Sequence, residues 1–148
     1  MALVKATDAL VAEAGSTVDV ERLRELSQHR LTAVRTAVAK NPSTPIDVLV
    51  DLVGDRHHLP RYGVAENPGS VSVQVVLEAA DSSVRAILAQ RRDLDAPTYE
   101  ALLADPDKDV RENLVWSTDR PDFLQRLAAD PHRSVRGSVP HRDICSTN

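Results

Sequence analysis

Five arginines recur at separations of 24 to 26 residues, and four of them follow an aspartate by four to six residues. The arginine series is Arg35, Arg61, Arg85, Arg111 and Arg136, and the aspartate series is Asp55, Asp81, Asp105 and Asp130. A row of guanidinium groups could bind the phosphate or carboxylate groups of a ligand. Because the two series run in step, the pattern favours a structural ladder. In that ladder each arginine pairs with an aspartate of its own or the adjacent repeat, or with a helix-end carbonyl.

A second pattern follows each arginine and singles out Trp116. The fourth residue after it is small or apolar and reads as buried, whereas the fifth is polar in every copy except at Trp116. Trp116 is therefore expected to be exposed, as are the aromatic and arginine side chains of binding hot spots. The alternative is that Trp116 folds over its neighbour as a local lid. Together with Trp116, polar and aromatic residues near the equivalent positions of neighbouring repeats are predicted to line one binding surface. These residues are Tyr62, Glu66, Gln90, Arg91, Glu112 and Trp116.

Other residues with chemical potential lack the spacing that catalysis or metal binding needs. His57 and His58 are adjacent, so they point apart on a helix, and no HxxxH or CxxC spacing accompanies them or His29. Cys145 lies in a polar segment without a histidine pattern. No G-x-S-x-G frame or glycine-rich phosphate loop occurs. We therefore expect no enzyme activity, no cofactor and no metal.

Self-similarity at a fixed period is the signature of a solenoid. Val110 and Leu114 are four residues apart, so they share one helical face. Asp105 followed by Pro106 predicts a helix start, with the aspartate as N-cap. Asn41-Pro42 predicts a helix end. Each copy is thus two short helical pieces, and because about 25 residues is short for two helices, one piece should be a single turn or a 3₁₀ segment.

The copies divide the chain into a cap, a repeat region and a tail, all within one domain over 1–148. Residues 1–26 form the cap, which begins with a helix over 2–14 that carries Leu3, Ala6, Leu10 and Ala14 on one stripe. Five copies fill 27–139, the fifth lacking its second half, and 140–148 form a frayed tail. An incomplete last copy also allows end-to-end homodimerisation.

The consensus A-D-P-x-x-x-V-R-x-x-(V/L)-(A/V), followed by N-P or a polar turn and P-x-x-x-L-x-x-L, resembles the leucine-rich repeat variant family over roughly Leu26 to Val139. The resemblance implies an all-α, HEAT-like solenoid of alternating α- and 3₁₀-helices in a right-handed α/α superhelix. Members of the family carry a cysteine-ligated iron–sulfur module ahead of the repeats. Cys145 is the chain's single cysteine, so that module is not expected here.

Composition narrows the classes of function. The net charge of −4 and the absence of a basic tail make nucleic acid an unexpected partner. The first residues read as neither a signal peptide nor a membrane span, and a cytoplasmic location is expected. The preferred hypothesis is a non-catalytic scaffold that binds a protein or peptide on its extended face. The alternatives are a repair protein resembling the HEAT-like alkylpurine DNA glycosylases, with Trp116 and Asp119 in the site, and a homo-oligomerisation scaffold.

Overall fold

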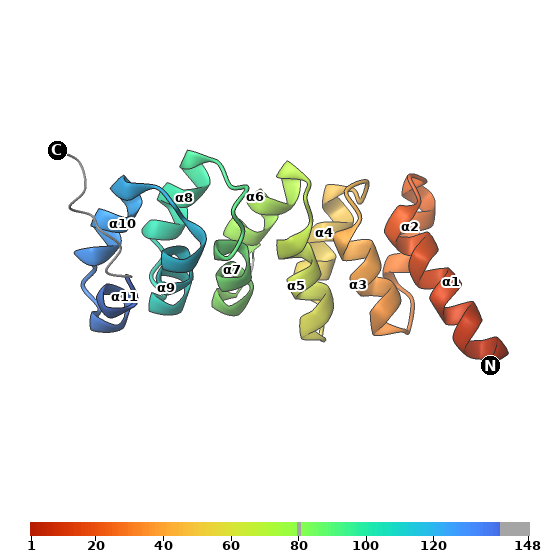
Figure 1. Ribbon diagram of the computed structural model, residues 1–148. Coiled ribbons are helices and arrows are strands. Elements are labelled where there is room, and N and C mark those ends of the chain that lie inside the picture. The colour runs from red at the N-terminus through yellow and green to blue at the C-terminus, as the bar shows by residue number, and fades with distance from the viewer. Residues whose placement is uncertain (80, 140–148) are drawn as a thin grey trace. The chain divides into compact units, whose positions relative to one another are not determined.

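The computed structural model describes residues 1–79 and 81–139, and within them every regular element is an α-helix and none is a strand (Figure 1). The helices are α1 (Ala2–Ser16), α2 (Val20–Ser27), α3 (Thr32–Lys40), α4 (Ile46–Val53), α5 (His58–Glu66), α6 (Ser70–Ala79), α7 (Ser82–Ala89), α8 (Ala96–Leu103), α9 (Lys108–Ser117), α10 (Pro121–Ala128) and α11 (Arg133–Ser138). The all-helical prediction is confirmed.

The chain forms two compact units, Met1–Val84 and Arg85–Asn148, whose boundary lies within α7. In the first unit, α1, α3 and α5 lie side by side in one layer, and α2, α4 and α6 form a second layer (Figure 1). In the second unit, α9 packs against α8, α10 and α11. That residues 1–148 form one solenoid stays a prediction, and the expected tail at 140–148 lies outside the described residues.

The core consists of the positions that the repeat pattern predicts to be apolar. Val34 and Val38 of α3 are fully buried, and so are Val110 and Leu114 of α9. The position four residues after each arginine is buried in the copies that the structure describes, namely Ala39, Ala65, Ala89 and Val115. The position after it is exposed in the same four copies. Counting four and five residues from each arginine therefore predicts correctly which position is buried and which is exposed.

The expectation of a 3₁₀ segment in each repeat is wrong. Both pieces of the first full copy are α-helices, α3 with 9 residues and α4 with 8, and no element within 1–79 and 81–139 is a 3₁₀-helix. Two helices fit because the turns are short. Backbone hydrogen bonds between residues three positions apart close the helix ends. The Gly54 N–H, for example, donates to the Asp51 carbonyl at 3.2 Å.

The predicted helix start at Asp105 is also displaced. Helix α9 begins at Lys108, and its N-cap is Asp107, whose side chain accepts a hydrogen bond from the Asp109 N–H. The Asp105 carboxylate instead accepts the Asp107 N–H at 2.9 Å in a turn that precedes the helix. An aspartate next to a proline therefore marks this turn and not the first residue of the helix.

Helix α1 departs from its predicted apolar stripe. Ala14 is buried, but Leu3 is 83% exposed and Ala6 is exposed too. Only the C-terminal part of α1 thus covers the neighbouring helices, as a terminal cap requires. Neither α1 nor any other helix in the described part of the chain is long and apolar enough to cross a membrane.

Gly63 permits the close approach of α5 to α3. A Cβ atom at this position would lie 2.9 Å from the Ala39 Cβ and 3.2 Å from the Thr36 carbonyl oxygen. We therefore expect Gly63→Ala to lower the free energy of unfolding by about 1–3 kcal/mol, because the helices must separate. Urea denaturation measures the loss. Gly137→Ala is the control: a Cβ there would meet nothing within 4 Å, so no loss is expected.

Candidate functional site

The first four arginines of the series form ion pairs with the aspartate of the following repeat. Arg35 Nε donates to Asp55 Oδ2 at 2.8 Å, and Nη2 donates to Oδ1 at 3.2 Å. Arg111 holds Asp130 in the same way, at 2.7 and 3.1 Å. The pair of Arg85 with Asp105 repeats this bidentate geometry, at 2.6 and 3.2 Å. Two parallel N–H donors on one carboxylate fix the orientation of both groups, so each pair clamps one repeat to the next.

Each well-paired aspartate performs three tasks. The Asp55 carboxylate accepts Arg35 and also the backbone N–H of His57 at 2.8 Å, while the Asp55 carbonyl accepts Arg61 Nη1 at 2.7 Å. Asp130, three repeats later, has the equivalent three partners: Arg111, the N–H of His132, and Arg136. The own-repeat arginine therefore contacts the aspartate carbonyl, and only the preceding arginine contacts its carboxylate.

The ion pair between Arg61 and Asp81 is the loosest of the four. Its Nε–Oδ2 distance is 3.8 Å, and the Asp81 side chain is 56% exposed. Arg61 Nε is buried and has no hydrogen-bond partner among the residues that the structure describes. Asp81 instead accepts the Ser83 hydroxyl and the Val84 N–H. This pair belongs to the repeat in which Pro60 replaces the usual valine, so the most divergent copy has the weakest clamp.

His29 takes the place of the aspartate in the first copy. It lies 26 residues before Asp55, its Nδ1 accepts the Leu31 N–H at 3.1 Å, and its carbonyl accepts Arg35 Nη1 at 2.8 Å. An imidazole can thus replace the carboxylate in closing the turn. His29 needs no negative charge there, because no arginine of the series precedes it. The same register, counted back from Asp55, could have identified His29 from the sequence.

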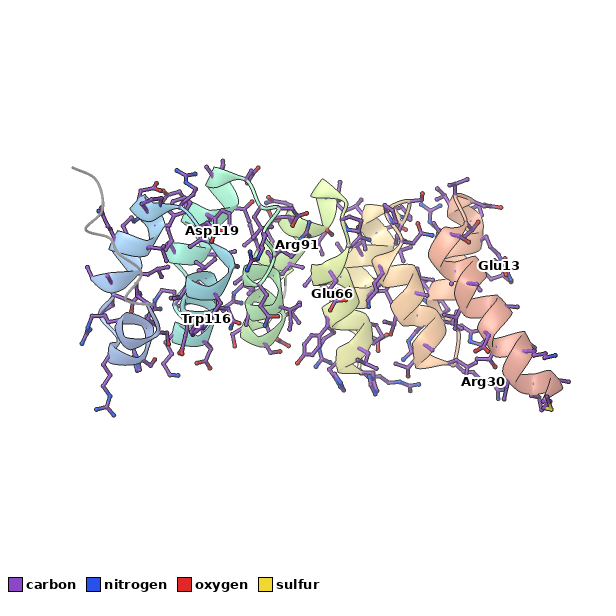
Figure 2. The ribbon with its side chains drawn as sticks, in the orientation of Figure 1. Glu13, Arg30, Glu66, Arg91, Trp116 and Asp119 are labelled. Carbon is purple, nitrogen blue, oxygen red and sulfur yellow. The ribbon has the colours of Figure 1, made fainter. Side chains whose placement is uncertain are left out.

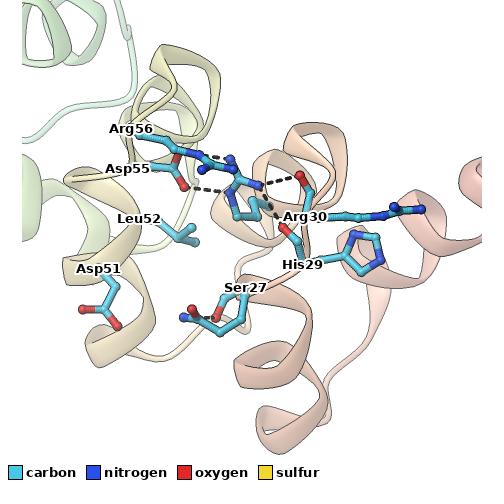
Figure 3. Close-up of a pocket in the computed structure, with 9 residues that line it drawn as sticks. Ser27, His29, Arg30, Asp51, Leu52, Asp55 and Arg56 are labelled. Atoms are coloured by element: carbon cyan, nitrogen blue, oxygen red, sulfur yellow. Dashed lines mark hydrogen bonds and ion pairs between the residues drawn. The ribbon is translucent and has the colours of Figure 1, made fainter.

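A cavity of about 440 Å³ surrounds the Arg35–Asp55 pair in the first unit (Figure 3). It is lined by Ser27, Gln28, His29, Arg30, Arg35, Asp51, Leu52, Asp55 and Arg56. The Arg35 guanidinium, which helps to line it, already donates to Asp55 and to the carbonyls of His29 and Arg30. Its hydrogen-bonding capacity is therefore used within the protein, which supports a structural role for this arginine.

The pKa values of two ladder aspartates make acid a test of the ladder. Burial raises the pKa of Asp55 and of Asp130, but hydrogen bonds from Arg35 and Arg111 and from a backbone N–H outweigh it, so both pKa values lie below the ordinary value. Groups with a depressed pKa in the folded state stabilise fully above their unfolded pKa, about 3.9 for aspartate. That stabilisation is lost as the pH falls through the folded-state values.

We therefore expect the free energy of unfolding to fall as the pH drops below about 4. Urea titrations at a series of pH values measure it. In a variant with Asp55→Asn and Asp130→Asn the unfolding free energy should be lower at neutral pH and should change less in acid. An equal acid dependence in both proteins would assign the effect to other carboxylates.

Buried asparagines join successive repeats in the first unit. Asn41 Nδ2 donates to the carbonyls of Ala14 and Thr17, both at 2.9 Å. Asn67, one repeat later, donates to those of Ala39 and Asn41, at 2.7 and 2.9 Å. Asn41 ends its helix, as predicted, and Asn67 ends α5 in the same way. Their side chains also satisfy carbonyls of the preceding repeat, which the sequence pattern did not indicate.

An exposed face of α9 gathers Trp116 and three polar residues. Asp109, Glu112, Asn113 and Trp116 lie three or four residues apart and line an open depression of about 310 Å³. Trp116 is 62% exposed, and no ring or cation lies against its indole among the described residues. We call these four residues the α9 face. Figure 2 shows Trp116 on α9, and it labels Asp119 in the segment before α10.

Hydrogen bonds hold the polar members of the α9 face in place. Glu112 Oε1 accepts the Ser138 hydroxyl of α11 at 2.6 Å, and Asn113 Oδ1 accepts Gln90 Nε2 at 3.1 Å. Of the predicted binding residues, Gln90, Glu112 and Trp116 are thus brought together. Asp109 and Asn113 were missed, although their helical spacing to Trp116 could have identified them.

The other three predicted binding residues have local partners elsewhere. Arg91 lies in the turn after α7, where it pairs with Asp93 at 2.7 Å. Tyr62 and Glu66 belong to the first unit, where Tyr62 makes an edge contact with His58 and Glu66 pairs with Lys40 at 2.9 Å.

The residues with metal-ligating or nucleophilic potential form no cluster in the described ranges. The expectation that His57 and His58 point apart is wrong: His57 caps α5 by accepting the Leu59 N–H, so it lies before the helix, and its ring stacks on that of His58. No group of three or more His, Cys, Asp or Glu side chains suited to a metal occurs in 1–79 and 81–139. Cys145 lies outside these ranges.

No protein-family model, curated protein or solved structure matches the chain. The resemblance to the leucine-rich repeat variant family stays a prediction that rests on the repeat pattern of the sequence.

Proposed function

We propose that the chain is a non-catalytic scaffold that binds a protein or peptide partner in the cytoplasm. Its proposed architecture is a HEAT-like solenoid, a right-handed superhelix of repeats that resemble the leucine-rich repeat variant family. The observation that carries the proposal is the exposed Trp116 indole on the α9 face. Tryptophan is among the residues that dominate binding energy at protein interfaces. A partner that covered the ring would also gain the free energy of burying its apolar surface.

The arginine series supports a scaffold because its charges are used between repeats. Arg35, Arg85 and Arg111 are each held by a carboxylate. They therefore leave no row of unpaired guanidinium groups for the phosphates of a nucleic acid. Asp119, the residue considered for a glycosylase-like site, is exposed and lies 3.9 Å from Arg92. The net charge of −4 also favours a protein partner over DNA.

Affinity capture from host lysate tests the proposal. The bait proteins are the unaltered chain, Trp116→Ala and Ile46→Ala, which removes a comparably exposed apolar side chain from α4. Far-ultraviolet circular dichroism verifies that each bait is folded. We expect one partner to be recovered by the unaltered chain and Ile46→Ala and lost with Trp116→Ala. Equal recovery by all three, or recovery of nucleic acid without protein, would overturn the proposal.

A further inference from the structure

The partner class can be deduced from the chemistry of the α9 face, on the assumption that the proposed function is correct. We infer that the α9 face binds an arginine side chain from a basic segment of the partner, with the guanidinium stacked on Trp116 and its charge opposite Glu112. The face offers one large π-surface and negative charge, and both attract a planar cation.

The indole is available for such stacking. Trp116 is 62% exposed, and among the described residues no arginine, lysine or aromatic ring lies over it. The contrast with Phe123 in the same unit is informative, because Arg120 lies 4.1 Å from the Phe123 ring centroid. The buried Phe123 ring thus has a cation–π contact with an arginine of the same chain. The described part of the chain supplies no such cation to the exposed tryptophan.

Glu112 provides the charge at a defined place. Its Oε1 accepts the Ser138 hydroxyl at 2.6 Å, and no ion pair holds its carboxylate within 1–79 and 81–139. The nearby Asp109 is different, because Lys108 pairs with it at 2.7 Å, whereas Lys108 acts on Glu112 only through a longer-range electrostatic interaction. Glu112 lies one helical turn before Trp116, so a cation on the indole can reach it. An anchored, half-buried carboxylate attracts a cation more strongly than a mobile one in bulk water does.

Charge and shape select among the occupants. The charge of Glu112 repels an acidic segment, and Asn113 and Glu112 make the depression polar, so a wholly apolar peptide is disfavoured. Arginine fits better than lysine because its planar guanidinium stacks on an indole and keeps N–H donors free for a carboxylate. The depression of about 310 Å³ is open, which suits one side chain of an extended segment.

The test uses the full chain and a blocked peptide of alternating glycine and arginine. Matched peptides carry lysine, glutamine or glutamate in place of arginine. Trp116 is the only tryptophan, so its fluorescence reports directly on this face. We expect the arginine peptide to change the emission, the lysine peptide to bind more weakly, and the glutamine and glutamate peptides to have no effect. High salt should weaken the binding.

Anisotropy of a labelled arginine peptide extends the test to variants without tryptophan. Trp116→Ala should weaken binding by about tenfold and Glu112→Gln by about three- to tenfold. Glu100→Gln is the control, because it removes the same charge from α8, where Glu100 pairs with Arg126. It should change binding by less than about twofold.

The outcomes separate this inference from the proposed function. Binding that survives Trp116→Ala, or that is equally strong for the glutamine peptide, overturns the inference. The same holds if the arginine peptide fails to bind while affinity capture still recovers a partner that requires Trp116. The proposed function would stand in that case, with a partner of different chemistry.

Discussion

Arg111→Met should be among the most destabilising single substitutions in the second unit. The Arg111 side chain is 11% exposed and holds the 6% exposed carboxylate of Asp130 at 2.7 Å. Methionine retains much of the aliphatic volume but removes the cation, so Asp130 keeps a buried charge without its partner. Breaking one side of a buried ion pair costs about 3–5 kcal/mol. Urea denaturation at neutral pH measures the difference.

Arg61→Met is the matched control for this prediction. Arg61 lies 3.8 Å from the 56% exposed Asp81, and its buried Nε already has no hydrogen-bond partner. Its replacement should cost only about 1 kcal/mol, mostly for the hydrogen bond to the Asp55 carbonyl. Similar losses for the two variants would show that ion pairing between repeats is not what stabilises the ladder.

Asn67→Ala should lower the free energy of unfolding by about 2–4 kcal/mol. The side chain is 1% exposed, donates to two carbonyls of the preceding repeat and accepts the Gly69 N–H at 2.8 Å. Alanine leaves all three backbone groups without this partner, and it leaves a cavity. Denaturation of the variant measures the loss, and hydrogen exchange should show faster exchange at the Gly69 amide.

Asn67→Asp separates the two causes. Aspartate has nearly the same volume, so it leaves no cavity, but it offers no donor to the carbonyls of Ala39 and Asn41. At neutral pH it should destabilise at least as much as alanine if the hydrogen bonds dominate. A much smaller loss for aspartate would assign the effect to packing. Asn113→Ala is the surface control, and its effect should stay within about 0.5 kcal/mol.

The repeat period made much of the fold predictable. Constant spacing identified the helix pairs, the buried position after each arginine and the polar position that follows it, because burial in a helix repeats every three to four residues. The partner of each arginine was harder to predict. Asp55 lies between Arg35 and Arg61, and spacing alone does not tell which one contacts its carboxylate. Its backbone turn decides, because that turn presents the carbonyl to Arg61.

The predictions that were wrong concern side chains and turns positioned by hydrogen bonds, which hydrophobic periodicity does not reveal. A 3₁₀ segment was expected because the turns were assumed to be longer than they are, whereas Asn41 and Asp55 close them with side-chain hydrogen bonds. Asn113 was not predicted because the comparison of equivalent positions between repeats does not include the three-residue spacing from Asn113 to Trp116 within α9. Arg91 was predicted to line the same surface as Trp116, whereas it pairs with Asp93 in the turn after α7.

The triple role of the ladder aspartates has a consequence for how such a chain can grow. The stretch 105–129 begins at one aspartate and ends just before the next. An in-frame tandem duplication of these codons would therefore give each new arginine an aspartate at its usual distance, and each new aspartate a following arginine. Unequal recombination can lengthen the gene by such a unit without leaving a buried charge unpaired. Because of the ladder, the repeat can be duplicated as a unit as well as packed as one.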